Sequence, residues 1–348
     1  MINEVKIQGK VIGNGCKPFI VAEMSGNHNQ SLERAFAIVD AAAEAGADAI
    51  KLQTYTADTL TMKGVHTIKE EGSLWYGKEL HDLYKEAYTP WEWHEQIIKR
   101  AESKNLICFS SPFDETAVDL LESLNTPAYK IASFENTHHP LLIKVAKTGK
   151  PVIMSTGVST VADIDESVKV LRSNGCKELI ILKCTSTYPA TAENTNLLTI
   201  PHMRDLYNCP VGLSDHTMGV GVSVAAVALG AVLIEKHFTL SRADGGVDSA
   251  FSLEPAELKS LVIETERAWQ ALGNVQYGVQ KAEEANTFYK RSVYISEDIK
   301  PGEKFTEQNT RVIRPGDGLA PKFYHIVLGK TATKHYSKGT PLKLDNLL

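Results

Sequence analysis

The sequence lacks the features that mark secreted, zinc-binding and membrane-spanning proteins. Its five cysteines are an odd number and form no Cys-X-X-Cys pair, which argues against a disulfide framework and a thiolate zinc site. The longest apolar stretch has 13 residues, from Val222 to Ile234, and is too short to cross a bilayer as a helix. The first ten residues, MINEVKIQGK, lack the apolar core of a secretory signal. We therefore expect a cytoplasmic protein.

The sequence also lacks a large excess of either charge. A formal net charge of −5 gives no reason to expect nucleic acid or an anionic membrane as a partner. The hydrophobic content of 43% is ordinary for a globular protein with a sizeable core. At 348 residues the chain exceeds one average domain, and it suits a β/α barrel of about 250 residues with a small appendage.

Eight short apolar runs are spread over the first 240 residues, and each ends, or nearly ends, on a polar or charged residue. In chain order they are FIVAE, ADAIKLQ, LICFSS, AYKIAS, PVIMS, ELIILKC, VGLSDH and AVLIEKH. Segments of helical periodicity lie between them, such as residues 32–43 behind the N-cap residue Ser31. This alternation predicts an α/β fold with a parallel sheet, and eight units favour a TIM (β/α)8 barrel over an open doubly wound sheet. The polar endings would then gather at the catalytic face of the barrel.

Two segments depart from this alternation. About 35 residues follow Gln53 before the next expected helix, near Thr89 and Pro90. We expect residues 54–88 to form a lid over the catalytic face, although a packing insert at the barrel rim is the alternative. After Leu272 a polar stretch precedes short strand-like pieces, so we predict a barrel domain at 1–273, a linker at 274–287 and a small domain at 288–348.

The predicted small domain differs from the barrel in charge. From residue 288 onward there are 11 Lys and Arg against 6 Asp and Glu, a net charge of +5. The rest of the chain has 26 against 36, a net charge of −10. The asymmetry suits a basic domain that serves an anionic substrate beside an acidic barrel, or it is a chance feature of a solvated surface.

Two lysines, Lys51 and Lys130, lie at the ends of separate predicted strands. Hydroxyl residues also end predicted strands or closely follow them: Ser111, Ser133, Ser155, Ser186 and Ser214. Converging ammonium and hydroxyl groups favour an anion site, most often one for phosphate. A buried lysine could instead form a Schiff base with a carbonyl substrate, or each lysine could simply pair with a nearby carboxylate.

Two histidines and one glutamate complete the polar strand ends. His216 and His237 follow the seventh and eighth runs, where adjacent strand ends would bring both imidazoles to one divalent ion. Two protein ligands would leave positions for water and substrate, as in a Lewis-acid site. Glu23, at the end of the first run, is a candidate general acid or base.

Nine stretches resemble the sialic acid synthase family, the nonulosonic acid synthases, over nearly the whole chain. They are AEMSGNHN, GADAIKLQTY, FSSPFD, YKIAS, MSTG, KCTSTYP, GLSDHT, IEKHF and IRPGDG. The segments SLWYGKELHDLYKEAYTPWEWH, ASFEN and APKFYHIVLGK are most similar to the pseudaminic acid branch. The resemblance implies a TIM barrel followed by an antifreeze-like (SAF, β-clip) domain. It also implies condensation of phosphoenolpyruvate with an amino-sugar aldehyde, here a diacetamido-trideoxy-altrose.

The resemblance assigns roles to individual residues. Glu23, Lys51, Lys130 and His237 would take part in catalysis, and His216 and His237 would hold a divalent metal, Mn²⁺ before Mg²⁺ or Co²⁺. Phosphoenolpyruvate would be bound by Lys51, Ser111, Lys130, Ser133, Ser155, Ser186, Tyr188 and Ser214. The sugar would be bound by Gln53, Glu135, Tyr188, Asp248 and Arg314. Arg314 would come from the partner subunit of a domain-swapped homodimer.

Four other functions are compatible with parts of the sequence. An N-acetylneuraminate or legionaminate synthase would use a different amino-sugar aldehyde at the same site. One residue departs from the family pattern, because Ser186 stands where sialic acid synthases have asparagine, which would alter its contact with phosphoenolpyruvate. A Schiff-base aldolase would use Lys130 or Lys183. A non-catalytic carbohydrate-binding scaffold would have no need for two histidines, two lysines and a glutamate at one rim.

Overall fold

The chain divides after Gly273 into two compact units, Met1–Gly273 and Asn274–Leu348. The computed structural model describes residues 4–346. The outermost residues of the two predicted domain ranges, 1–3 and 347–348, lie outside the described residues. In the described part no helix is both long enough and apolar enough to cross a membrane.

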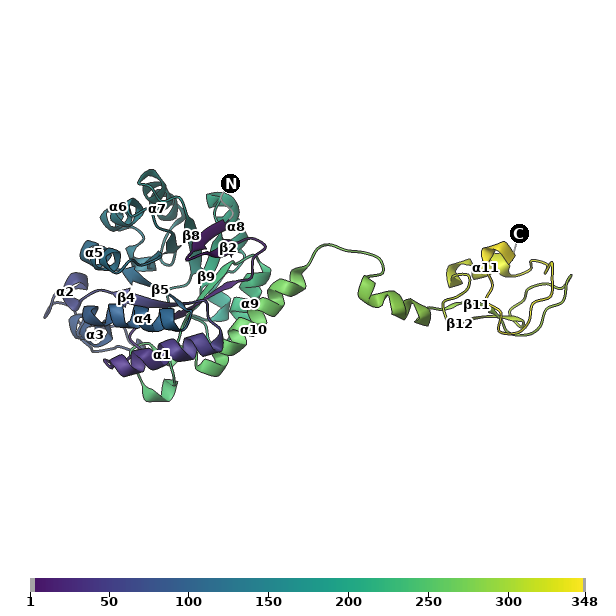
Figure 1. Ribbon diagram of the computed structural model, residues 1–348, viewed down its shortest axis with the longest axis horizontal. Coiled ribbons are helices and arrows are strands. Elements are labelled where there is room, and N and C mark those ends of the chain that lie inside the picture. Colours follow the sequence, from purple (N-terminus) through teal and green to yellow (C-terminus); the bar gives the residue numbers. More distant parts are fainter. Residues whose placement is uncertain (1–3, 347–348) are drawn as a thin grey trace. The chain divides into compact units, whose positions relative to one another are not determined.

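The first unit is built around a closed barrel of eight parallel strands (Figure 1). Around the barrel the strands are β3 (Phe19–Glu23), β4 (Ala49–Thr54), β5 (Ile107–Pro112), β6 (Tyr129–Ile131), β7 (Val152–Ser155), β8 (Leu179–Cys184), β9 (Val211–Ser214) and β10 (Leu233–His237). Each of the eight predicted runs contains one of these strands, except that β4 and β5 extend one residue beyond the end of their runs, to Thr54 and Pro112. Because β10 pairs with β3 and closes the sheet, the predicted TIM barrel is confirmed and the open sheet is excluded.

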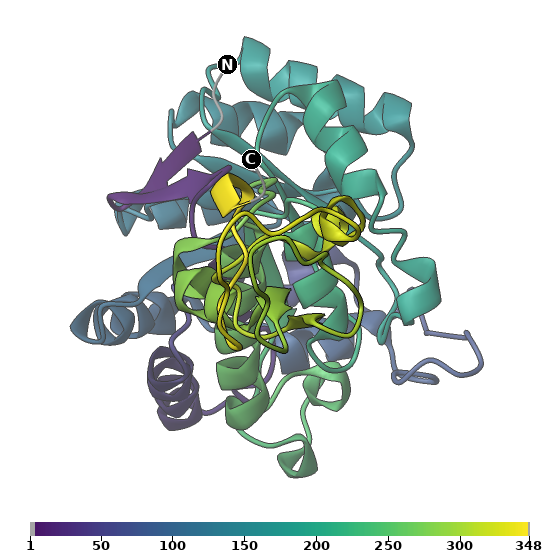
Figure 2. The same ribbon diagram turned by 90° about the vertical axis from the view of Figure 1, so that its right-hand side faces the viewer.

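Helices surround the strands on the outside of the barrel (Figure 2). They are α1 (Leu32–Ala45), α2 (Ala57–Leu60), α3 (Leu80–Ala87), α4 (His94–Ser103), α5 (Glu115–Ser123), α6 (His139–Lys147), α7 (Val161–Ser173), α8 (Thr199–Tyr207), α9 (Gly221–Ala228) and α10 (Pro255–Leu272). The predicted N-cap is confirmed, because the Ser31 side chain accepts a hydrogen bond from the Arg34 backbone. The apolar faces of these helices, except α2 and α3, form the larger hydrophobic core together with the outward-facing strand residues.

A two-stranded hairpin closes the amino-terminal end of the barrel, and the sequence analysis did not predict it. Strands β1 (Glu4–Ile7) and β2 (Lys10–Gly13) pair antiparallel. Val5, Ile7 and Ile12 are fully buried and pack with inward-facing residues near the strand starts, such as Phe19. The open end of the barrel is therefore the opposite one, where the strands finish.

The long connection after β4 is partly helical. It contains α2 and α3, with an irregular stretch between them that is tied by a bridge between Thr67 and Glu79. Trp75 in this stretch donates a hydrogen bond from Nε1 to the Val247 carbonyl at 3.0 Å. The connection thus contacts the loop that follows β10, on the side where the strands end.

The second unit has its own hydrophobic core. It pairs β11 (Ser292–Ile295) antiparallel with β12 (Thr310–Ile313) and has one short helix, α11 (Tyr324–Val327). Its buried residues include Val293, Phe305 and Tyr336. Between Gly273 and β11 lies a 3-10 helix at Lys281–Tyr289 with no buried residue, which begins in the predicted linker and extends two residues beyond it.

Candidate active site

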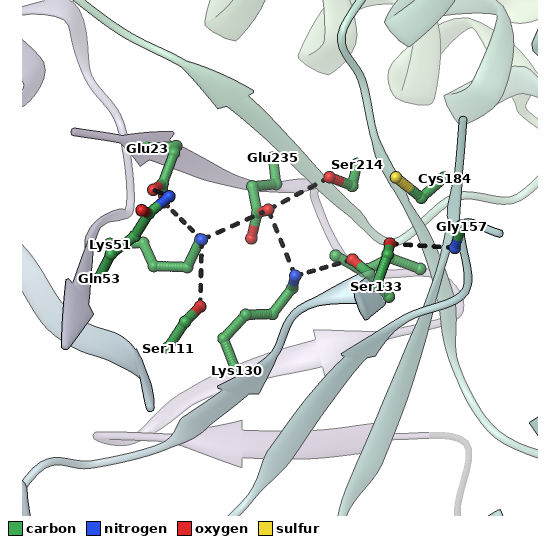
Figure 3. A network of polar contacts seen from close by, with 12 residues as sticks. Glu23, Lys51, Gln53, Ser111, Lys130, Ser133, Gly157, Cys184, Ser214 and Glu235 are labelled. Carbon is green, nitrogen blue, oxygen red and sulfur yellow. Dashed lines mark hydrogen bonds and ion pairs between the residues drawn. The ribbon is translucent and has the colours of Figure 1, made fainter. Parts of the chain in front are cut away.

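The polar strand endings converge inside the open end of the barrel. Side chains alternate along a strand, so residues two apart on one strand face the same side. In the parallel register Glu23 lies beside Lys51, and Ser214 lies beside Glu235. Figure 3 shows the side chains of Glu23, Lys51, Lys130 and Glu235 pointing toward one another.

Lys51 lies between two carboxylates. Its Nζ is 2.6 Å from Glu23 Oε2 and 3.7 Å from Glu235 Oε1, and it donates a hydrogen bond to Ser111 Oγ at 3.3 Å. Burial alone would lower the pKa of Lys51, but the two carboxylates raise it above its ordinary value. Lys51 is therefore a fixed cation that is only 4% exposed.

Lys130 has weaker anionic support. It donates a hydrogen bond to Ser155 Oγ at 2.7 Å, and its nearest carboxylate oxygen is Glu235 Oε1 at 3.5 Å. Burial lowers the pKa of Lys130, and the attraction of Glu235 only partly offsets this effect. The two lysines thus differ in pKa because Lys51 has two carboxylate partners and Lys130 has one.

Glu235 is a residue of the site that the sequence analysis did not assign. Its carboxylate lies between both lysines and accepts a hydrogen bond from Ser214 Oγ at 3.2 Å. Burial tends to raise its pKa, but Lys130 and then Lys51 hold it below the ordinary value. Its position near the end of the eighth run is the sequence feature that indicates a place in the site. Its negative charge, however, does not suggest that it helps to bind an anion.

Glu23 differs from Glu235 in its ionisation. Burial raises the pKa of its carboxyl above the ordinary value, against the opposing attraction of Lys51. Gln53 donates a hydrogen bond from Nε2 to Glu23 Oε1 at 2.9 Å, which fixes the carboxyl on the β3 side of the cluster. A buried carboxyl with a raised pKa is suited to general acid or base chemistry.

Hydroxyl and amide groups border the lysines on the β6 to β8 side. The Gly157 backbone N–H donates to Ser133 Oγ at 3.0 Å. A Cβ at residue 157 would collide with Ser186 Oγ and would come within 2.8 Å of Ser133 Oγ. A side chain at residue 157 would displace both hydroxyls, so glycine at this position lets Ser133 and Ser186 lie close together.

His216 and His237 face each other at the ends of β9 and β10. Their ring centroids are 5.4 Å apart at an interplanar angle of 61°. Nδ1 of His216 lies 3.0 Å from the Thr185 carbonyl. Burial tends to lower the pKa of His216, but its hydrogen bond to Cys184 raises the pKa above its ordinary value. Nδ1 of His237 is buried without a hydrogen-bond partner. Within residues 4–346 no three His, Cys, Asp or Glu side chains form a group able to hold a metal ion.

Two of the predicted sugar-site residues, Tyr188 and Asp248, lie beside these histidines. Tyr188 packs its ring 4.5 Å from His216, and Asp248 Oδ2 lies 3.8 Å from His237 Nδ1. Asp248 also accepts a hydrogen bond from Ser25. Burial raises the pKa of Glu135 to about 7. Gln53 lies beside Glu23, and Arg314 is exposed directly after β12 in the second unit.

The long connection contributes an aromatic side chain to this region. The Trp75 ring lies 6.2 Å from Tyr188, and its indole N–H is held by Val247, next to Asp248. Tyr188 therefore has Trp75 as a neighbour in addition to His216. The connection contacts the predicted sugar site, as a lid would; its movement stays a prediction.

Comparisons with known proteins identify the family. The NeuB family model matches residues 38–277, and the SAF domain model matches residues 290–348. The pseudaminic acid synthase of Campylobacter jejuni is 44% identical over 94% of this chain and 96% of its own length. The N,N'-diacetyllegionaminic acid synthase of the same organism is 37% identical over 92% of this chain and 98% of its own length.

Solved structures agree with this result. The crystal structure of N-acetylneuraminic acid synthetase from Leptospira borgpetersenii matches with a TM-score of 0.73 at 33% identity. The match covers 81% of this chain and 94% of that one. The family model matches most of the barrel. The strand ends of this barrel converge on buried lysines, two histidines and two glutamates. The chain belongs to the NeuB family and ends in a SAF domain.

Proposed function

We propose that this protein is a pseudaminic acid synthase. It would condense phosphoenolpyruvate with 2,4-diacetamido-2,4,6-trideoxy-altrose and water to give pseudaminic acid and inorganic phosphate. The observation that carries the proposal is the pair of buried lysines, Lys51 and Lys130, facing one carboxylate at the open end of the barrel. The 44% identity to the pseudaminic acid synthase of C. jejuni supports the choice of sugar.

The lysines are suited to a substrate with two anionic groups. Phosphoenolpyruvate has a carboxylate and a phosphate, and each would replace part of the ion pairing that Glu23 and Glu235 now supply. Because both ammonium groups are buried, their attraction for these anions is weakly screened. The groups that would surround this substrate are Lys51, Ser111, Lys130, Ser133, Ser155, Ser186, Tyr188 and Ser214.

His216 and His237 would hold a divalent metal ion, Mn²⁺ before Mg²⁺ or Co²⁺. The facing imidazoles fit such an ion, and so does the buried Nδ1 of His237, which has no hydrogen-bond partner. Bound there, the metal would supply Lewis-acid polarisation of the sugar aldehyde. With two protein ligands, most coordination positions stay open to water and substrate.

Glu23 would act as the acid and base of the reaction. Carbon 3 of phosphoenolpyruvate forms a bond to the aldehyde carbon as the aldehyde π bond opens, and carbon 2 becomes electron-deficient. The Glu23 carboxyl gives its proton to the new alkoxide oxygen. Water then adds to carbon 2 and gives up a proton to the Glu23 carboxylate. The bond between carbon 2 and the phosphate oxygen breaks, which releases inorganic phosphate and leaves the 2-keto acid. Lys51, 2.6 Å from Glu23, would balance the charge as the proton moves.

The sugar would lie between the histidines and the long connection. Gln53, Glu135, Tyr188 and Asp248 would contact its polar groups, and Arg314 of a second copy would complete the site in a domain-swapped homodimer. Trp75 and its neighbours Leu74 and Tyr76 offer apolar surface for the methyl group of a 6-deoxy sugar. We also propose a cytoplasmic location, which would keep the five cysteines reduced; all five are unpaired in the structure.

Phosphate release tests the proposal. The purified protein is assayed with phosphoenolpyruvate and Mn²⁺ against diacetamido sugars of the altrose, mannose and bacillosamine type, and the product is identified by mass. We expect the altrose sugar to give the highest kcat/KM. A preference for another sugar would indicate a legionaminate or N-acetylneuraminate synthase, and no release with any sugar would favour a non-catalytic scaffold.

One observation favours a second function enough to test it. The lowered pKa of Lys130 would also suit a Schiff-base aldolase acting on pyruvate. Lys183 suits this function less, because its Nζ donates to the Cys184 carbonyl and to Thr185 Oγ1, away from the cluster. Borohydride treatment in the presence of pyruvate should leave the protein mass unchanged. A covalent adduct at Lys130 would support the aldolase.

A further inference from the structure

The two histidines are flanked by a second pair of residues that the proposed reaction does not use. Asp215 immediately precedes His216, and Lys236 immediately precedes His237. Because side chains alternate along an extended chain, a pair that precedes two inward-facing histidines points outward. Asp215 and Lys236 meet there, on the outer side of β9 and β10.

The outward pair forms a buried ion pair. Lys236 Nζ lies 3.0 Å from Asp215 Oδ2, and both side chains are only 1% exposed. Ser223 on α9 donates to the same oxygen at 2.6 Å. The other carboxylate oxygen accepts from the Thr217 N–H at 2.9 Å and from Thr217 Oγ1 at 2.7 Å. Asp215 therefore has four hydrogen-bond partners and no unsatisfied oxygen.

This network spans the residues on either side of His216. Lys236 also donates to the Thr217 carbonyl at 2.6 Å, so one ammonium group holds both Asp215 and Thr217. The regular pairing of β9 with β10 ends at Ser214 and Glu235. His216 lies beyond that last pair, where its carbonyl accepts a hydrogen bond from the Ala190 N–H at 3.0 Å on the β8 side. On the β10 side, the lysine that precedes His237 ties down the turn that contains His216.

Stability alone gives a weak reason for a buried ion pair at this place. Desolvation of two charges offsets most of their attraction, and a well-packed apolar pair is often as stable. A buried pair can instead select one arrangement of the elements that it joins. Here the elements joined are the two chain segments that carry the imidazoles.

We propose that the Asp215–Lys236 pair is a positioning device that sets the distance and orientation between His216 and His237. The inference rests on the proposed metal site, because the geometry of two imidazoles has a consequence only if they share a ligand. Both residues act from outside the barrel through the backbone and contact neither substrate. Groups that orient metal ligands in this indirect way typically contribute about 10- to 100-fold to metal affinity.

Metal binding by the full chain tests the proposal without an activity assay. The metal-free protein is titrated with Co²⁺, and the dissociation constant and the d–d absorption band are recorded together with the thermal midpoint. For Lys236→Met and Asp215→Asn we expect Co²⁺ affinity to fall about 10- to 100-fold, with a changed d–d band. Ser223→Ala keeps the ion pair and loses one hydrogen bond, so a loss of about 2- to 10-fold is expected.

A control variant separates positioning from general loss of stability. Arg100→Met breaks the ion pair of Arg100 with Asp40, which joins α4 to α1 away from the histidines. This variant should lower the thermal midpoint and leave Co²⁺ affinity within about two-fold of the wild type.

Two results would overturn the proposal, and they differ in what they overturn. A lower thermal midpoint with unchanged Co²⁺ affinity in Lys236→Met would make the pair merely structural. If that variant does not fold, the same pattern in Ser223→Ala would decide against positioning. Failure of the wild-type protein to bind Co²⁺ would overturn the two-histidine metal site itself, and the role of the pair with it.

Discussion

Replacing Glu23 by glutamine separates its proposed chemistry from its structural contacts. The Glu23 carboxylate lies 2.6 Å from Lys51 Nζ, which corresponds to roughly 6 kcal/mol of gross Coulomb attraction at an effective dielectric constant of about 20. Desolvation of the buried pair offsets much of this attraction. Glutamine keeps the size of the side chain and can still accept a hydrogen bond from Lys51. Lys51 also keeps Ser111 at 3.3 Å and Glu235 at 3.7 Å, so the variant should fold.

We expect the Glu23→Gln variant to lose turnover and to keep phosphoenolpyruvate binding. Positioned general acid–base groups typically contribute about 10²- to 10⁴-fold in rate, so kcat should fall by that factor, or by roughly 3–5 kcal/mol in barrier height. In the wild type, Glu23 and Glu235 oppose the charges of Lys51 and Lys130. The substitution removes one negative charge beside them, and KM for phosphoenolpyruvate should stay equal or fall.

The assay is phosphate release at saturating sugar and varied phosphoenolpyruvate, with thermal unfolding as the check on folding. Lys51→Met is the matched control, because it should raise KM for phosphoenolpyruvate strongly. A Glu23→Gln variant with kcat within about three-fold of the wild type would refute the acid–base role. A raised KM with unchanged kcat would make Glu23 only a partner that orients Lys51.

Three further predictions concern other parts of the first unit. Burial raises the pKa of Glu135 to about 7, so its carboxyl is neutral below that pH. We expect kcat/KM for the sugar to rise with pH through about pH 7, and to be independent of pH in Glu135→Gln. The same pH dependence in both proteins would contradict a role of the ionised Glu135 in sugar binding. Trp75→Phe keeps an aromatic ring beside Tyr188 and loses the hydrogen bond to Val247, so KM for the sugar should rise about 2- to 10-fold. An equal rise in KM for phosphoenolpyruvate would exclude a sugar-specific effect. His28 and His94 are buried, which lowers the pKa of each to about 4, and the unfolded chain therefore binds protons first as pH falls below about 6.5. Urea unfolding should show a loss of roughly 2 kcal/mol per histidine between pH 7.5 and 5, reduced in His94→Gln; stability independent of pH over that range would show that the histidines do not remain neutral.

The sequence predicted the barrel well because one physical rule applies to every strand. A parallel strand covered by helices outside and filled by side chains inside must be apolar along its length, so the eight runs were visible. The N-terminal hairpin has a local signal, because EVKI alternates exposed and buried residues and Gln8 and Gly9 form its turn with positive φ. Its strands have only four residues each, and no local pattern shows that they close the end of a barrel. The long connection was recognised by its length, but its helices α2 and α3 were not predicted.

Part of the candidate site was likewise predictable from the sequence, and part was not. Residue type and position alone indicated an anion site, because the cations Lys51 and Lys130 and several hydroxyl residues lie at strand ends. Glu235 was passed over because one carboxylate among lysines acquires its meaning only from distances of 3.5 and 3.7 Å to both ammonium groups. The opposite pKa shifts of the two lysines also depend on those distances, and no property of the isolated residues predicts them.

The sequence by itself determined which side chains reach the open end of the barrel, because the period of two along a strand decides which residues face inward. Strand pairing and the side-chain contacts decided which of them meet. Glu23 and Lys51 are 28 positions apart in the chain, yet they lie side by side because β3 and β4 are neighbours in one register. The same holds for Asp215 and Lys236, which are adjacent to the two histidines in sequence but contact each other only through the packing of β9, β10 and α9. Charge, burial and hydrogen bonding depend on such non-local contacts, and these are formed only when the chain folds.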